Sequence, residues 1–435
     1  MAGCKSRVEQ TGSFQRISIL PANVLVDDES FNWAALASTF VIQQDLATSA
    51  SILPSFATDQ SGAYGQGASA VVRSTVEKRR GRIRVSAVLT DLSTQKNRQT
   101  IESEGPESEG LIQRLDAVSK RLDPERAAPF STRSDNALQA FVAAAAASNA
   151  EGRAKLLDQA VSIDPAFGLA QSALVELVPG RATADPRITG RFVPLDRARY
   201  MTLLARINHA PIATQANAQA AVLALAPNNL EALAELGWLS FLQGKSGQGE
   251  QILRKAISLS PQNFALQLQL AQGLVASRRF PQAIQILQAL SGTNPSVLPG
   301  LAAAKLLAGD AKGAEAVIGR FVNLLPPGTP ARTFIEQQWK AIVDNQPPGA
   351  EMGGNTPLAP GYRAFLEGRF PEAISFWQGV MQQTAGTDLR ARAMLAASLE
   401  KAGKKNQVEV LPYLPDFTDL YASTAFNQMR RLLKM

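Results

Sequence analysis

The chain has 435 residues, of which 45% are hydrophobic and 19% are charged, and its net charge is +7. This length allows two or three domains with a buried core, and the composition is that of a folded protein. The chain has one histidine, His209, and one cysteine, Cys4, so zinc clusters, disulfide frameworks and Ser–His–Asp or Cys–His catalysis are excluded or nearly so. His209 stands just before a proline and is interpreted as the end of a helix.

Residues 1–15 are polar and lack hydrophobic periodicity, so they are predicted to form a flexible tether. The segment MAGCKS resembles the end of a bacterial lipoprotein signal, with Ala2-Gly3 ahead of Cys4, although the charged and apolar parts of a signal peptide do not precede it. The resemblance implies lipidation of Cys4 and a periplasmic, membrane-anchored location. The alternatives are a free surface thiol and a cytoplasmic location. No segment reaches the roughly 18 consecutive apolar residues needed to span a bilayer.

Residues 16–125 are predicted to form an α/β domain. The apolar segment 16–25 is predicted to be a strand, followed by a helix that Asp28 or Ser30 could cap, and by a second strand at 50–56. Residues 58–67 are predicted to form a loop. Three strands then follow, the first two joined by a tight turn at Arg80-Gly81, and a helix at 109–121 ends the domain.

This βαβ unit with a β-meander and a helix is a common two-layer arrangement. With ISILPANV at its start and ASAVVRSTVEKRRGRIRVSAVLTDL at its centre, it resembles the TolB-type N-terminal domain. That family implies an envelope or signalling module without enzymatic activity.

Three sequence features of this domain could in principle bind a ligand. Gly65, Gly67 and Ala70 have the spacing of a dinucleotide-binding loop, but a β-like segment follows them where a helix is required. The basic run at 78–84 could contact phosphates, yet no aromatic residues interleave it, so a solvated turn is favoured. The carboxylates at 27–29 and 102–109 lie in loop contexts without a nucleophile. No cofactor, metal, small-molecule substrate or nucleic acid is expected.

The remainder of the chain is predicted to be an all-α repeat array. Residues 126–136 are predicted to be a linker, 137–344 the array, 345–360 a loop, and 361–435 further repeats with a C-terminal capping helix. The array is most regular between Pro227, Pro261 and Pro295, which are 34 residues apart. Each interval contains two amphipathic segments. This period and this arrangement of segments resemble the tetratricopeptide repeat (TPR).

The fold class is therefore predicted to be an α+β N-terminal domain followed by a TPR solenoid. In TPR proteins one face of each first helix lines a groove that holds a partner. Mapped onto this sequence, the groove comprises Glu231, Ala234, Trp238, Phe241, Leu268, Gln269, Gln272 and Val275. The two aromatic residues are predicted either to anchor a partner or to fill gaps between repeats. The basic and asparagine residues with which some TPR domains bind a peptide carboxylate are replaced, since Ala234 and Trp238 occupy two of those positions.

These patterns favour a non-enzymatic scaffold or adaptor of the bacterial cell envelope that binds protein partners. The alternative is a cytosolic signalling or regulatory module with the α/β domain as the sensor. An enzyme that uses the α/β domain has the least support.

Overall fold

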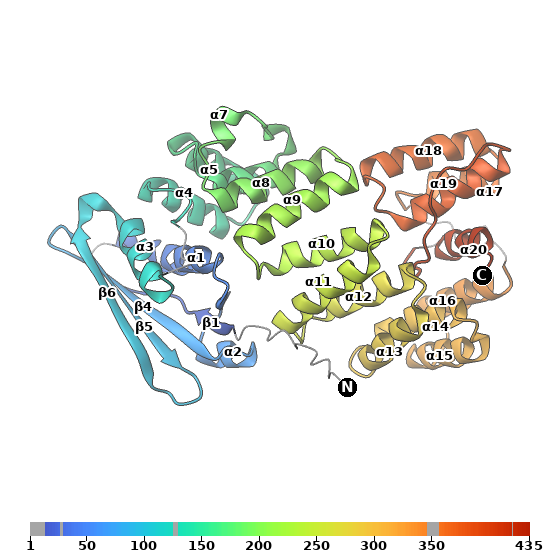
Figure 1. The fold of residues 1–435 in the computed structure, drawn as a ribbon, viewed down its shortest axis with the longest axis horizontal. Helices are drawn as coiled ribbons and strands as arrows, with labels where there is room; N and C mark the ends of the chain where they lie inside the picture. Colours follow the sequence, from blue (N-terminus) through green and yellow to red (C-terminus); the bar gives the residue numbers. More distant parts are fainter. Residues whose placement is uncertain (1–13, 27–28, 125–128, 346–355, 420) are drawn as a thin grey trace, which may run out of the picture. The chain divides into compact units, whose positions relative to one another are not determined.

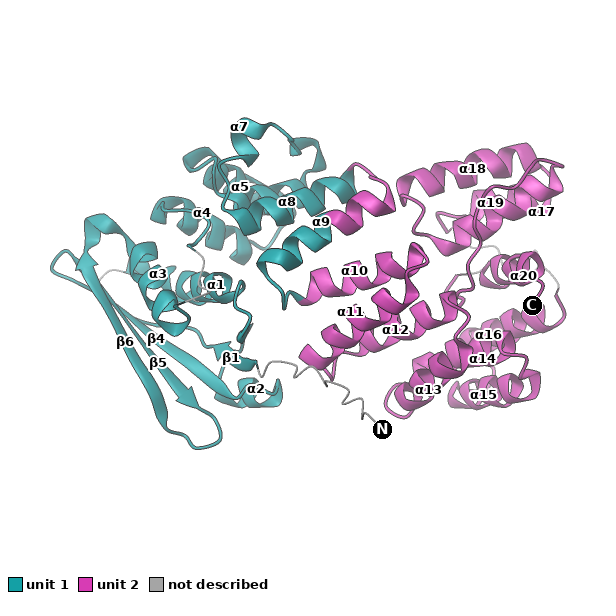
Figure 2. Ribbon diagram, in the orientation of Figure 1, with its two compact units in different colours: residues 1–207, 218–229 teal, residues 208–217, 230–435 magenta. Residues whose placement is uncertain are grey.

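The computed structural model describes residues 14–26, 29–124, 129–345, 356–419 and 421–435. The chain forms two compact units (Figure 2). Unit 1 comprises residues 1–207 and 218–229, and unit 2 comprises 208–217 and 230–435.

The N-terminal part of unit 1 is a mixed β-sheet (Figure 1). Its strands are β1 (Gln15–Ile19), β2 (Asn23–Val26), β3 (Ile52–Phe56), β4 (Ala70–Arg79), β5 (Arg82–Asp91) and β6 (Asn97–Pro106). The order is β3-β1-β4-β5-β6, with β2 also paired to β4. Strand β1 pairs in parallel with β3 and β4, and β2 pairs in parallel with β4. The strands β4, β5 and β6 form the antiparallel meander. The predicted βαβ unit and meander are confirmed.

Two details of this part differ from the sequence prediction. The strand expected at 16–25 is interrupted around Pro21, which has no N–H to donate to a ladder, and forms β1 and β2. The loop expected at 58–67 contains the short helix α2 (Gln60–Gly65), because the Asp59 carboxylate accepts a hydrogen bond from the Gly62 N–H at 2.7 Å.

The core of the sheet lies on the face covered by the helices α1 (Ala34–Leu46) and α3 (Leu111–Leu122) (Figure 1). Alternate residues such as Val72, Val85 and Ile101 point into this core. Val71 lies on the opposite face, in a smaller apolar cluster with Ala63 of α2. Most of that second face is polar.

The sheet and the first helices that follow it share one core. Asp135, at the start of α4, accepts hydrogen bonds from the N–H groups of Leu111 and Ile112 at 2.6 and 3.2 Å, and so caps α3. Phe130 is buried and packs edge-on against Phe40 of α1 and Phe167. A linker was expected at 126–136, whereas the structure buries Phe130, Ser131 and Thr132. The sequence does not predict this burial, because an isolated phenylalanine among polar residues shows no hydrophobic periodicity.

The other elements of unit 1 are helical. They are α4 (Asp135–Ala146), α5 (Ala150–Ile163), α6 (Gly168–Leu177), α7 (Pro186–Thr189) and α8 (Pro194–Ile207), with short 3-10 turns at Glu29–Phe31, Glu107–Glu109 and Pro179–Arg181. The boundary between the units falls within α9 (Ile212–Leu225).

Unit 2 consists of helical hairpins. Its helices are α10 (Leu230–Leu242), α11 (Ser246–Leu259), α12 (Phe264–Ala276), α13 (Phe280–Ser291), α14 (Leu298–Leu307), α15 (Ala311–Leu324), α16 (Pro330–Val343), α17 (Ala359–Leu366), α18 (Phe370–Gln383), α19 (Leu389–Lys401) and α20 (Ala422–Leu433), with a 3-10 turn at Pro295–Val297. Gly244, Gly309, Gly368 and Gly403 have positive φ between paired helices or after α19, as expected for these turns. The predicted α+β domain followed by a helical array is confirmed.

The first regular repeat depends on a very close approach of α10 and α11. A Cβ atom placed on Gly249 would lie 2.8 Å from the carbonyl oxygen of Gly237 and 2.8 Å from the Phe241 ring. Glycine at 249, where the repeat pattern expects alanine, is therefore required by the backbone of α10 and by the neighbouring aromatic ring.

The C-terminal helix does not follow sequence order in the stack. Residues 361–435 were expected to end in a capping helix, whereas α20 packs between α16 and α19 (Figure 1). Asn427 donates a hydrogen bond to the Ala341 carbonyl at 2.8 Å, and the Ser423 N–H donates to Gln338 at 3.2 Å. The last helix therefore joins two earlier parts of unit 2.

The close approach of α10 and α11 gives a stability prediction. Gly249→Ala forces either the Gly237 backbone or the Phe241 ring to move and should lower the free energy of unfolding by about 1–3 kcal/mol. Gly247→Ala in the same helix is the matched control, because a Cβ there meets nothing within 4 Å. Chemical denaturation of the full chain measures both. Equal stability of the two variants would contradict the packing described.

Candidate functional site

The predicted partner-binding residues lie on α10 and α12, the first helices of two consecutive repeats. The two helices pack side by side, and the Gln269 side-chain amide donates a hydrogen bond to the Ala234 carbonyl at 3.2 Å. A side chain of one repeat therefore fixes the spacing to the next. We call the surface formed by Glu231, Ala234, Trp238, Leu268, Gln269 and Gln272 the inner face.

The residues of the inner face are accessible to different degrees. Glu231 is exposed, and the other five are half-buried. Trp238 and Leu268 rest against the core of unit 2 while part of each side chain remains accessible. Half-buried aromatic and aliphatic groups flanked by amides combine apolar area with groups that can hydrogen-bond a peptide.

The structure places the other two predicted residues in the core. Phe241 is 2% exposed and Val275 is 0% exposed. The Phe241 ring occupies the space left by Gly249 of α11 and Gly273 of α12. For Phe241 the gap-filling alternative is therefore the one observed, and neither residue lines the inner face. Partner binding by the remaining six stays a prediction.

Second helices of neighbouring repeats are also linked, through Glu250 of α11. Its carboxylate pairs with Arg254 at 2.8 Å and with Arg279, which precedes α13. The hydrogen bond from Arg279 is the main cause that lowers the pKa of Glu250. No sequence pattern predicts this ion pair, because Glu250 and Arg279 lie in different repeats.

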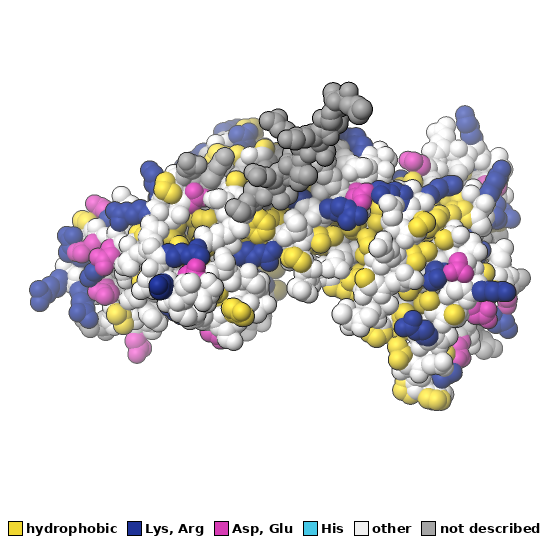
Figure 3. All heavy atoms as spheres, turned by 60° about the horizontal axis from the view of Figure 1, so that its bottom comes forward, with side chains coloured by type: hydrophobic (Ala, Val, Ile, Leu, Met, Phe, Trp, Pro, Cys, Tyr) yellow, Lys and Arg dark blue, Asp and Glu magenta, His cyan; other side chains and the backbone are white. Residues whose placement is uncertain are grey.

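The basic hairpin tip of unit 1 is largely neutralised by neighbouring carboxylates. Arg82 pairs with Glu104 at 2.5 Å, Arg84 with Glu102 at 2.7 Å, and Lys78 with Glu107 at 2.6 Å. Figure 3 shows acidic side chains among the basic ones at this end of the molecule. These ion pairs offset three of the five basic side chains of the tip and account for the carboxylates at 102, 104 and 107.

The glycine-rich segment does not have the geometry of a dinucleotide site. Gly65 ends helix α2, and Gly67 has a φ of 75° in the turn before strand β4. A dinucleotide loop runs instead from a strand into a helix N-terminus, which supplies the phosphate-binding N–H groups. His209 is exposed and follows α8, as its sequence context predicted.

A buried carboxylate that sequence analysis missed lies between α1 and α3. Asp45 is 1% exposed, and its nearest polar neighbours are the side chains of Asp116 and Ser119. Burial, followed by the charge of Asp116, raises the pKa of Asp45 well above its ordinary value. Asp116 itself pairs with Arg133 and accepts a hydrogen bond from the Phe130 N–H at 3.3 Å. The nearby Ser119 hydroxyl is buried and donates a hydrogen bond to the Leu115 carbonyl at 3.1 Å, so the pair has the features of a structural contact between α1 and α3.

Two further findings concern the described residues. No helix among them is long and apolar enough to cross a bilayer, and no group of three or more metal-ligating side chains converges there. Cys4, the predicted lipidation site, and Asp28 lie outside the described residues.

Comparisons with known proteins agree with the repeat geometry. The family described as "Tetratricopeptide repeat" matches residues 240–306, so TPR-type repeats are confirmed for this part of the chain. This family supports an interaction scaffold and gives no indication of a catalytic domain. No curated protein matches the chain.

Solved structures match only distantly. A tetratricopeptide repeat protein from Parabacteroides merdae is 13% identical, with 61% of this chain and 100% of that one covered, at a TM-score of 0.34. The Naa15/Naa10 complex bound to HypK-THB is 14% identical, with 62% and 34% covered, at a TM-score of 0.26. The human IFIT1 dimer with PPP-AAAA is 11% identical, with 74% and 78% covered, at a TM-score of 0.31. At these scores, none of them carries an argument about partners or ligands.

The buried carboxylate predicts a pH dependence of stability. Because the folded-state pKa of Asp45 is raised, folded chains keep a proton that unfolded chains release above about pH 4. Stability should therefore decrease as pH rises from there until the folded-state pKa is passed. Asp45→Asn removes this titration and should raise the free energy of unfolding at pH 8 by about 1–3 kcal/mol, with a smaller gain at pH 4.

Chemical denaturation at both pH values measures this effect. Glu151→Gln, at an exposed carboxylate of the same unit, is the matched control and should change stability by less than about 0.5 kcal/mol. A loss of stability in Asp45→Asn at pH 8 would contradict the raised pKa assigned to Asp45 in the folded state.

Proposed function

We propose that the protein is a non-enzymatic scaffold that binds a segment of a protein partner on the inner face of α10 and α12. The observation that carries this proposal is the position of Trp238, which rests on the core of unit 2 but keeps part of its surface accessible. A rigid aromatic group fixed on a helix loses little conformational freedom on binding and is therefore an effective anchor.

The neighbouring residues fit a partner segment of mixed character. Leu268 extends the apolar surface, and Gln272 and Glu231 add polar groups at its margin. Because Gln269 is already bonded to the Ala234 carbonyl, the two helices are pre-arranged before a partner arrives. Because the two helices do not have to move, the partner binds to a surface that is already formed.

We further propose that the scaffold belongs to the bacterial cell envelope, anchored in the periplasm through a lipid on Cys4. The supports are the resemblance of MAGCKS to a lipoprotein processing site and of residues 16–125 to the TolB-type domain. Diacylglycerol mass on the chain from native membranes, and its loss in Cys4→Ser, would support this location. An unmodified thiol on a soluble chain would favour the alternative, a cytosolic signalling module.

The inner face gives the test of the proposed function. Trp238→Ala and Gln272→Ala should each reduce the recovery of specific co-purifying proteins from native cells by about tenfold, because each removes part of the contact area. Quantitative mass spectrometry of the purified assemblies measures this. Direct titration of the recovered partner against each variant then follows.

Tyr64→Ala is the matched control, because Tyr64 is an aromatic residue of unit 1 that is 70% exposed. It should retain the same proteins as the unaltered chain. The proposal fails if the Trp238→Ala and Gln272→Ala chains are folded and retain the full set.

A further inference from the structure

A second candidate site lies in unit 2, away from α10 and α12. A cavity of about 790 Å³ opens on one face of α18, between residues 356–358 just before α17, the start of α19 and the turn at 416–419. Leu358, Phe376 and Val380 provide apolar walls, and Ser375 and Gly379 leave space on the helix surface. This volume is in the range of pockets that hold small ligands or single side chains of a peptide.

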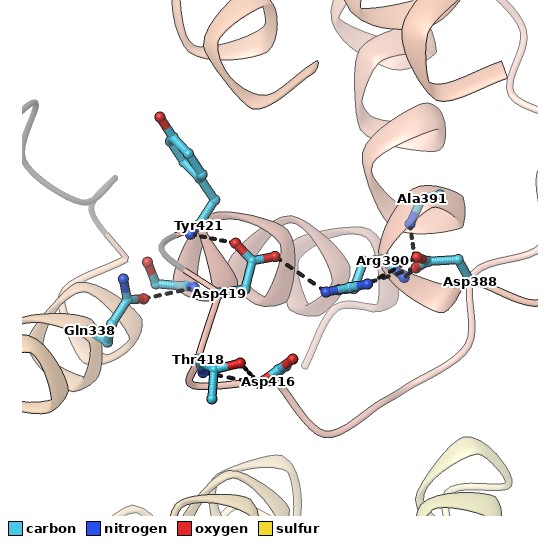
Figure 4. Close-up of polar contacts among 9 residues, drawn as sticks. Gln338, Asp388, Arg390, Ala391, Asp416, Thr418, Asp419 and Tyr421 are labelled. Carbon is cyan, nitrogen blue, oxygen red and sulfur yellow. Dashed lines mark hydrogen bonds and ion pairs between the residues drawn. The ribbon is translucent and has the colours of Figure 1, made fainter. Parts of the chain in front are cut away.

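Three charged residues line this cavity, and they contact one another (Figure 4). Arg390 approaches the Asp388 carboxylate at 3.1 Å and the Asp419 carboxylate at 3.3 Å. Asp388 also caps α19 by accepting the N–H groups of Arg390 and Ala391. Asp419 accepts the N–H of Tyr421 at 3.0 Å. Local backbone contacts therefore hold both carboxylates in place.

The lining carries an excess of negative charge. Two carboxylates face one guanidinium, and no other charged side chain lines the cavity among the residues that the structure describes. Asp419 is only 7% exposed, so water screens its charge poorly. A partly buried carboxylate is costly unless it is paired, and one guanidinium at 3.1–3.3 Å is shared between two of them. The cavity therefore favours a cation although the whole chain is basic.

A hydroxyl group in the lining provides a second observation. Thr356 lines the cavity, and its buried hydroxyl has no hydrogen-bond partner among the described residues. Tyr362 is 0% exposed and stacks on Tyr421, with ring centroids 4.8 Å apart. Burial, and then the charge of Asp419, raises the pKa of Tyr362, so this hydroxyl faces the carboxylate. Buried polar groups usually have partners, so the Thr356 hydroxyl indicates a place where a bound polar group completes the contacts.

We propose that this cavity binds an organic cation, in which an ammonium or guanidinium group contacts Asp419 and Asp388 and an apolar stem lies along Phe376 and Val380. The cation is either a free amine or the side chain of a lysine or arginine in a peptide. An anion is disfavoured because Arg390, the one cationic group of the lining, already pairs with both carboxylates. The proposal goes beyond the scaffold function and does not depend on the inner face.

Titration calorimetry of the full chain tests the proposal with matched probes. Hexylamine represents a free amine and acetyl-Phe-Lys-amide a peptide side chain. Hexanol and acetyl-Phe-Lys(acetyl)-amide are their uncharged counterparts. We expect at least one of the two cations to bind and both neutral probes to bind about tenfold more weakly or not at all. Tighter binding of hexylamine identifies a free amine, and tighter binding of the peptide identifies a side chain.

Variants of the charged residues assign the binding to this cavity. Asp419→Asn should weaken binding of the cation by about tenfold or more. Arg390→Gln should tighten its binding, because a competing positive charge is removed. Trp238→Ala should leave it unchanged. Circular dichroism of each variant establishes that it is folded. The proposal is overturned if neither cation binds, if the neutral probes bind equally well, or if folded Asp419→Asn binds as the unaltered chain does.

Discussion

The close contact between α10 and α11 is the constraint on which the regular repeats depend. The two backbones approach so closely at Gly237 and Gly249 that no side-chain atom fits between them. The space beside them is filled by Phe241, which also reaches Gly273 of the next repeat. One aromatic ring therefore joins three helices, and its burial leaves the neighbouring Trp238 as the aromatic group that remains partly accessible. This geometry assigns Phe241 to packing and leaves Trp238 accessible for the binding that we propose.

Contacts between elements that are distant in sequence also stabilise the rest of the chain. In unit 1, Asp135 caps α3 from the start of α4, so the sheet and the first helices share a core. In unit 2, α20 packs between α16 and α19 and thereby joins segments that are distant in sequence. The charged cluster around Arg390 lies where the turn before α20 meets the start of α19. Long-range packing thus creates the cavity that we propose as a cation site.

Features encoded locally were predictable from the sequence. The 34-residue spacing of Pro227, Pro261 and Pro295 predicted the helical hairpins, and Arg80-Gly81 predicted the turn between β4 and β5. Features that depend on distant contacts were not predictable. Helical periodicity gives the same inward face to Phe241 and Trp238, and only the glycines of neighbouring helices decide which ring is buried. Likewise, no pattern in the sequence brings Asp388, Arg390 and Asp419 to one cavity or places α20 beside α16.

Phe241 holds the repeats together, and we propose that Trp238 binds the partner. A side-by-side measurement of unfolding free energy and partner recovery for Phe241→Ala and Trp238→Ala tests it most directly. Phe241→Ala should lower the free energy of unfolding by about 3–5 kcal/mol, the usual cost of removing a buried aromatic side chain. Trp238→Ala should retain most of its stability and lose the partner. If folded Trp238→Ala keeps the partner, or if Phe241→Ala is as stable as the unaltered chain, the division of roles is contradicted.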